Sequence, residues 1–160
     1  MAQKEIHSAL RQVGARYASS DLTKCRKTAA LAHNLRVLRH TNGGPKGLLT
    51  KLSQLEGTAH DRRRVKYMMK CLWYIGSKGA RDFLMEMGLV RDPVALDVRV
   101  MNILQAVGLP LPEKRVPGDA STYDEIEARV LADICKPLKL TGIEFDRMIY
   151  QNYESIMQVT

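Results

Sequence analysis

Apolar side chains recur along most of this chain at intervals of three and four residues, the spacing of one face of an α-helix. Between residues 61 and 76, for example, Val65, Met68 and Leu72 would share such a face. No stretch alternates apolar and polar residues with period two between hairpin turns, as half-buried strands do. The sequence therefore predicts an all-α protein of about eight helices.

Glycine and proline mark where these helices end, and short polar side chains mark where they begin. We expect helices over residues 4–17, about 19–40 and about 46–55, between Asp61 and Gly76, between Ser77 and Gly88, and from Asp97 to Gly108. Asp61, Ser77 and Asp97 are the expected N-caps of three of them. The helix that runs to about residue 40 has three candidate N-caps, Ser19, Ser20 and Asp21. Two capping boxes, Thr122 to Glu125 and Thr141 to Glu144, are expected to open the last two helices.

The length of 160 residues suits one compact domain, which we expect to span residues 1–160 and to act as a monomer. No apolar run approaches the roughly twenty residues of a membrane span, and the N-terminus lacks the apolar core of a secretory signal. We therefore expect an intracellular protein, associated with the nucleoid or located in a nucleus. Cys25, Cys71 and Cys135 have no metal-binding spacing and are expected to be small buried hydrophobes.

The net charge of +8 is unevenly distributed along the chain. Residues 1–80 contain 16 Lys and Arg against 4 Asp and Glu, whereas residues 81–160 contain 9 against 13. Basic side chains that neutralise phosphates release condensed counterions, so the basic half favours a nucleic-acid partner. A basic surface that only keeps the protein soluble is the alternative.

A glycine turn between residues 72 and 76 separates two of the expected helices and places Lys78 at the start of the second. The first N–H groups of a helix have no intrahelical partner and point outward with the positive end of its dipole. Gly76 and Gly79 would let a phosphate approach this backbone, and Ser77 would add a side-chain donor. The turn therefore indicates phosphate binding, although two helices joined by small residues also form plain packing corners.

The hairpin residues belong to a longer pattern, because Asp97 follows Lys78 by nineteen residues at the start of the next apolar helix. With Asp97 included, residues 61–108 resemble the helix-hairpin-helix DNA glycosylase superfamily, with the hairpin at about 61–88. That family has the pattern L-P-G-[IV]-G-x-K-x-A, followed by an aspartate in a [VL]-D-x-[HR]-V context. The residues that carry the hairpin pattern here are Leu72, Ile75, Gly76, Lys78 and Ala80.

The resemblance implies two helical lobes with a cleft that receives a damaged base rotated out of double-stranded DNA. It implies a bifunctional DNA glycosylase and AP lyase of base-excision repair, with Lys78 as nucleophile. Asp97 would stabilise positive charge on the sugar and assist deprotonation of the lysine. A Schiff base then permits β-elimination without a cofactor or catalytic metal. Likeness to the small 8-oxoguanine glycosylases favours that lesion. DNA contacts are expected at Gly76, Ser77, Gly79, Arg62, Arg63, Arg81 and Arg99.

Several alternatives stay open. Trp73 and Tyr74 stand where the family pattern has Pro and Gly, and Arg99 stands where many members have His. Lys78 alone is also compatible with phosphate binding, and Asp97 alone with an ordinary N-cap. In that case the chain would be a non-catalytic helix-hairpin-helix DNA-binding module. A glycosylase for oxidised pyrimidines is a second alternative. A basic protein that binds RNA or another protein is a third. We expect Trp73 in the core, with stacking on a base as the alternative.

Overall fold

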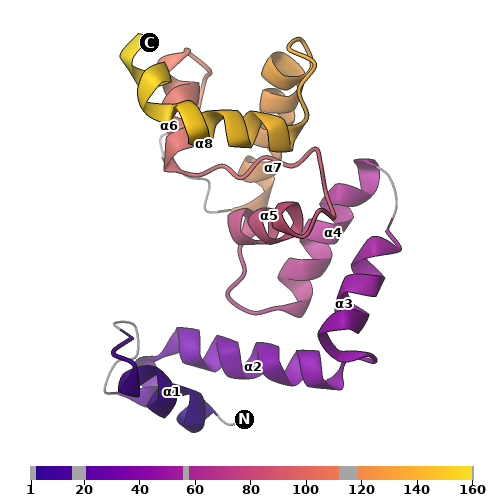
Figure 1. Ribbon diagram of the computed structural model, residues 1–160, viewed down its shortest axis with the longest axis vertical. Helices are drawn as coiled ribbons and strands as arrows, with labels where there is room; N and C mark the ends of the chain where they lie inside the picture. Colours follow the sequence, from indigo (N-terminus) through magenta and orange to yellow (C-terminus); the bar gives the residue numbers. More distant parts are fainter. Residues whose placement is uncertain (1–2, 16–20, 56–57, 112–118, 160) are drawn as a thin grey trace. The chain divides into compact units, whose positions relative to one another are not determined.

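The computed structural model describes residues 3–15, 21–55, 58–111 and 119–159, and every regular element in these ranges is a helix (Figure 1). The all-α prediction is therefore confirmed for the described part of the chain. None of its helices is long and apolar enough to cross a membrane. In chain order the elements are α1 Gln3–Gln12, η1 Leu22–Lys24 (a 3₁₀-helix), α2 Arg26–His40, α3 Gly44–Ser53, α4 Thr58–Cys71, α5 Ser77–Glu86, α6 Val98–Ala106, α7 Ala120–Arg129, η2 Val130–Cys135 (a π-helical turn) and α8 Gly142–Val159.

The chain divides into two compact units, and helix α4 contributes to both. The first unit comprises Met1–Leu55 and Lys66–Gly76, and the second comprises Glu56–Val65 and Ser77–Thr160. The single domain expected over residues 1–160 stays a prediction. We describe each unit by itself.

In the first unit, α2 packs against α1 and α3 and also holds the turn that follows α4. The ring of His33 stacks on the indole of Trp73, with centroids 3.8 Å apart and an interplanar angle of 10°. Asn34 donates its Nδ2–H to the Trp73 carbonyl at 3.0 Å and accepts the Trp73 N–H at 2.7 Å. A side chain in mid-helix therefore satisfies both backbone groups of one turn residue, which fixes the turn against α2.

Helix α2 begins later than its sequence pattern predicts. Asp21 caps the short η1 instead, because its carboxylate accepts the Thr23 N–H at 2.9 Å, and α2 starts only at Arg26. Ser19 and Ser20, the other expected caps, lie outside the described residues. Helix α3 starts at Gly44 rather than Lys46, with Pro45 in its first turn, a position where the missing N–H of proline is not needed.

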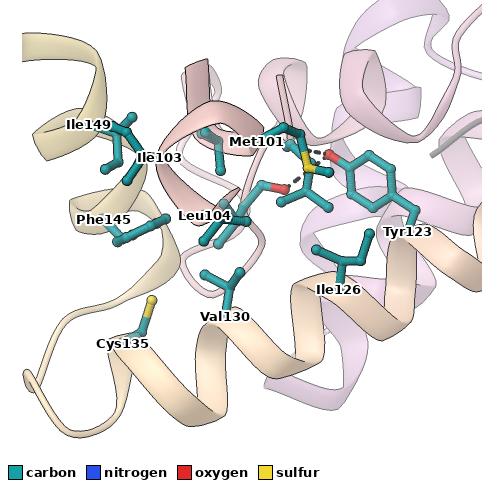
Figure 2. Packing of buried hydrophobic residues seen from close by; sticks show 12 residues of the cluster. Met101, Ile103, Leu104, Tyr123, Ile126, Val130, Cys135, Phe145 and Ile149 are labelled. Atoms are coloured by element: carbon teal, nitrogen blue, oxygen red, sulfur yellow. Dashed lines mark hydrogen bonds between the residues drawn. The ribbon is translucent and has the colours of Figure 1, made fainter. Parts of the chain in front are cut away.

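In the second unit, α6 and α8 pack together, and α7 runs into the π-turn η2 beside them (Figure 2). Tyr123 is buried, accepts the Leu96 N–H at 2.7 Å and donates its hydroxyl to the Val94 carbonyl at 3.1 Å. These bonds fasten the loop before α6 to α7 across 27 residues of sequence. The buried cluster consists of Val94, Leu96, Val100, Met101, Ile103, Leu104, Tyr123, Ile126, Val130, Cys135, Phe145 and Ile149.

The same loop is also fastened to the start of α8. The Ile143 N–H donates to the Arg91 carbonyl at 3.0 Å. Gly142 lies so close to the loop that an added Cβ would stand 1.8 Å from the Asp92 carbonyl oxygen. Only glycine permits this approach, which brings the first turns of α8 beside the residues that lead into α6.

Two of the expected helix caps are confirmed. Asp97 has extended backbone angles, and its Oδ1 accepts the N–H groups of Arg99 at 2.9 Å and Val100 at 3.0 Å. In the box that opens α8, the Thr141 N–H donates to Glu144 Oε2 at 2.8 Å, and the Glu144 N–H donates to Thr141 Oγ1 at 3.3 Å. Both caps are complete within three residues of sequence, as the patterns require.

Two other expected helix caps are wrong. Helix α7 is capped by Asp119, which accepts the Thr122 N–H at 2.8 Å, so the Thr122 to Glu125 box is not formed at the helix start. Asp61 does not cap α4, because that helix begins three residues earlier at Thr58. The Asp61 carboxylate is buried and accepts the N–H groups of Arg91 and Asp92, each at 3.4 Å. These bonds attach the loop after α5 to α4.

Candidate active site

The second unit contains a cavity of about 410 Å³ whose wall combines one amine with several carboxyl groups. The structure therefore brings Lys78 and Asp97 to one cavity, although their catalytic roles stay predictions. Such a cavity falls within the size range of small-molecule sites. The charged and aromatic residues that line it are Lys78, Asp82 and Glu86 from α5, Asp97 from the cap of α6, and Asp146, Arg147 and Tyr150 from α8.

Lys78 is the second residue of α5, and its ammonium group forms an ion pair with Asp82 one turn later. Both side chains remain partly exposed, at 44% and 39%. Ser77, expected to be the N-cap, is itself the first residue of the helix. The amine therefore lies at a helix N-terminus, in an ion pair that a ligand in the cavity can reach.

Asp97 lines the same cavity while it caps α6. Capping uses Oδ1 for both backbone hydrogen bonds, which fixes the orientation of the carboxylate relative to the helix. A carboxylate held in this way can stabilise positive charge in the cavity without a change of rotamer. The ordinary cap and the electrostatic partner are thus compatible roles for one side chain.

Asp146 is a third carboxyl group of this cavity, and sequence reasoning missed it. Burial, together with the neighbouring carboxylates of Asp82 and Asp97, raises the pKa of Asp146 to about 6. A backbone hydrogen bond from Ala95 and the charge of Lys78 act in the opposite direction. In the sequence Asp146 is one acid on an amphipathic helix, a pattern that usually indicates a solvated face, so no local signal marked it.

Arg81, predicted to contact DNA, is 1% exposed, and we assign it a structural role instead. Its guanidinium forms a two-pronged ion pair with Glu127, at 2.6 and 2.7 Å, and a third bond to Asp124 at 2.9 Å. Burial opposes the charge, but the pairing with Glu127 outweighs it, so the pKa of Arg81 is raised. Arg81 also donates to the Ser77 carbonyl at 3.1 Å, which fastens the start of α5, and with it Lys78, to α7.

The remaining predicted DNA contacts have different surroundings. Gly76 and Gly79 are exposed, and so are Arg62 and Arg63 on α4. Arg99 is exposed next to the cavity, and its guanidinium lies 4.8 Å from the ring centroid of Tyr150. These positions leave the backbone of two glycines and three guanidinium groups accessible to an anionic ligand.

The hairpin departs from the sequence expectation in two ways. Tyr74, which stands at a glycine position of the family pattern, has a φ of 64°, in the left-handed region that glycine adopts most readily. Trp73 is 55% exposed and stacks on His33, so its predicted burial in the core is wrong. The turn therefore carries two exposed aromatic side chains.

In the described part of the chain, no group of three or more His, Cys, Asp or Glu side chains could hold a metal ion. Cys25 and Cys135 are buried, as expected, and Cys71 is half-buried. Burial raises the pKa of the Cys135 thiol to about 11, which makes it a poor nucleophile at neutral pH.

No family model, curated protein or solved structure matches this chain. Interpretation of the cavity consequently depends on the chemistry of its own side chains.

Proposed function

We propose that the protein is a bifunctional DNA glycosylase and AP lyase that removes an oxidised base from double-stranded DNA. The observation that carries this proposal is the position of Lys78 and Asp97 in the wall of one cavity of about 410 Å³. An amine beside a fixed carboxylate is the arrangement that Schiff-base chemistry on an abasic sugar requires. We propose the helix-hairpin-helix DNA glycosylase fold as well.

In this proposal the damaged nucleotide is rotated out of the duplex, so that its base enters the cavity. Lys78 Nζ attacks the sugar C1′ and becomes linked to it as an iminium ion after the base has left. Asp97 stabilises the positive charge that develops on the sugar. Arg99, Gly76 and Gly79 contact the DNA backbone, while Arg81 holds the start of α5 in place from the interior.

The direct test is borohydride trapping on a duplex that contains one 8-oxoguanine. The wild-type protein is expected to form a covalent adduct with the DNA strand, and Lys78→Gln is expected to form none. Asp97→Asn should lower the rate of adduct formation by about 100-fold, the lower range for loss of one electrostatic stabiliser. Lys136→Gln, which removes an exposed lysine of the same unit, is the matched control and should trap like wild type.

Trapping by Lys78→Gln, or the absence of an adduct when wild type is bound to the duplex, would contradict the proposal. The ion pair between Lys78 and Asp82 favours one competing function, a DNA-binding module without catalysis, because a paired lysine is also a structural element. That function predicts unchanged DNA affinity for Asp97→Asn and no strand cleavage on any lesion.

The lesion itself is a separate question, since 8-oxoguanine is proposed from the family resemblance alone. A panel of duplexes with single 8-oxoguanine, thymine glycol or abasic sites distinguishes the alternatives. A preference for thymine glycol would assign the cavity to oxidised pyrimidines. Cleavage at the abasic site alone would leave the lyase activity without a glycosylase step.

A further inference from the structure

Asp146 lines the same cavity as Lys78, and it has charged neighbours on every element that borders it. It lies in the first turns of α8, where Gly142 brings the helix against the loop that leads into α6. The titratable and charged groups that share its cavity are Lys78, Asp82 and Glu86 of α5, Asp97 before α6, and Arg147 and Tyr150 of α8 itself, and Arg99 borders a small adjoining cavity.

The chemistry proposed for Lys78 needs both a proton acceptor and a proton donor, and the family resemblance offers only Asp97, as an aid to lysine deprotonation. An ammonium group cannot attack carbon until it has lost a proton, and the departing base needs a proton in return. Asp97 is oriented by its cap, and Asp82 is the ion-pair partner of the lysine. Glu86 also lines the cavity, but Asp146 is the carboxyl group whose surroundings combine the charge of Lys78 with the carboxylates of Asp82 and Asp97.

From this geometry we infer that Asp146 is the proton acceptor and donor for Lys78, an inference that rests on the proposed function. Burial among carboxylates raises the pKa of Asp146 to about 6. A group with a pKa near the working pH exchanges protons readily in both directions, which is the property required of a general acid and base.

The steps balance as follows. The Asp146 carboxylate takes a proton from the Lys78 ammonium, and the freed lone pair of Nζ forms a bond to C1′. The C1′–N bond to the damaged base breaks, and the base leaves with that electron pair and the proton from Asp146. The Nζ–C1′ adduct then returns a proton to Asp146, which donates it to O4′ as the C1′–O4′ bond opens and the iminium ion forms. At an abasic site the same proton expels water from the carbinolamine.

The test measures single-turnover borohydride trapping on a duplex with one abasic site, from about pH 5 to about pH 8. With wild type the rate is expected to rise with pH and to level off above about pH 6, where Asp146 is ionised. The pH profile of Asp146→Asn should lack this change of slope. The variant should react about 100-fold more slowly at neutral pH, a factor at the lower end of the range for loss of a general base. Asp146→Glu keeps a titratable group, so it should keep a bend and recover part of the rate.

Asp133→Asn, the same exchange at an exposed carboxylate of η2, is the control and should follow the wild-type profile. A bend near pH 6 that persists in Asp146→Asn would overturn the inference while trapping through Lys78 still supported the proposed function. No adduct with wild type, by contrast, would reject the proposed function itself. If Asp146→Asn does not fold, Asp146→Glu decides, because an unchanged bend position and rate in that variant also contradict the inference.

Discussion

Replacement of Asp146 by asparagine should stabilise the protein at neutral pH, and the size of the effect follows from the surroundings of the carboxyl group. In the folded protein the pKa of Asp146 is raised from 3.8 to about 6, mainly by burial and then by the carboxylates of Asp82 and Asp97. The folded state therefore binds this proton more tightly than the unfolded state does. Between about pH 4 and pH 6 the folded state carries more protons, so the free energy of unfolding falls as pH rises through this window.

A pKa difference of about two units lowers the free energy of unfolding by about 3 kcal/mol, at about 1.4 kcal/mol per unit. This loss of stability is complete above about pH 7. Asparagine has nearly the same shape as aspartate but no charge, so the Asp146→Asn variant does not lose this stability as pH rises. The variant should be more stable than wild type by about 2–3 kcal/mol at pH 7.5 and similar to it at pH 4. For a chain of this length the difference amounts to a rise of roughly 5–10 °C in Tm.

Urea unfolding followed by far-UV circular dichroism at several pH values measures this difference. Fluorescence is less suitable, because the single tryptophan, Trp73, belongs to the first unit whereas Asp146 belongs to the second. Asp133→Asn serves as control and should leave stability unchanged within about 0.5 kcal/mol at every pH. A wild-type protein that is the more stable of the two at pH 7.5, or a difference that does not vary with pH, would refute the reasoning.

Three further substitutions test the fold around the cavity and the hairpin. Arg81→Met leaves the buried carboxylate of Glu127 without its ion-pair partner and should cost about 3–5 kcal/mol in urea unfolding; a loss below about 1 kcal/mol would contradict its structural role. Gly142→Ala would place a Cβ 1.8 Å from the Asp92 carbonyl oxygen and should lower stability by about 3 kcal/mol, whereas Gly76→Ala, with open space around it, should be nearly neutral in the same assay. Tyr74→Gly relieves a left-handed backbone and should raise stability by up to about 1 kcal/mol by Trp73 fluorescence; a clear loss would mean that the Tyr74 side chain packs.

Local patterns in the sequence were sufficient for the helical class, for two of the helix caps and for part of the candidate site. The helical period established the all-α class, and the caps at Asp97 and Thr141 formed as predicted because each is completed by neighbours within three residues. The position of Lys78 at the start of a helix follows from the glycine turn before it.

Contacts between distant residues decided the rest. A cap competes with other partners, so the Asp61 carboxylate contacts N–H groups 30 and 31 residues away instead of capping a helix. Arg81 is an interior side chain because two nitrogens of its guanidinium bond the carboxylate of Glu127, which lies 46 residues later in the sequence. The raised pKa of Asp146 has the same origin, since desolvation and the charges of Asp82 and Asp97 act only after α5, α6 and α8 have come together. Sequence alone thus determined the helical class and the caps at Asp97 and Thr141, which need only neighbouring residues, while tertiary structure decided which charges are buried, because burial depends on partners that no local pattern contains.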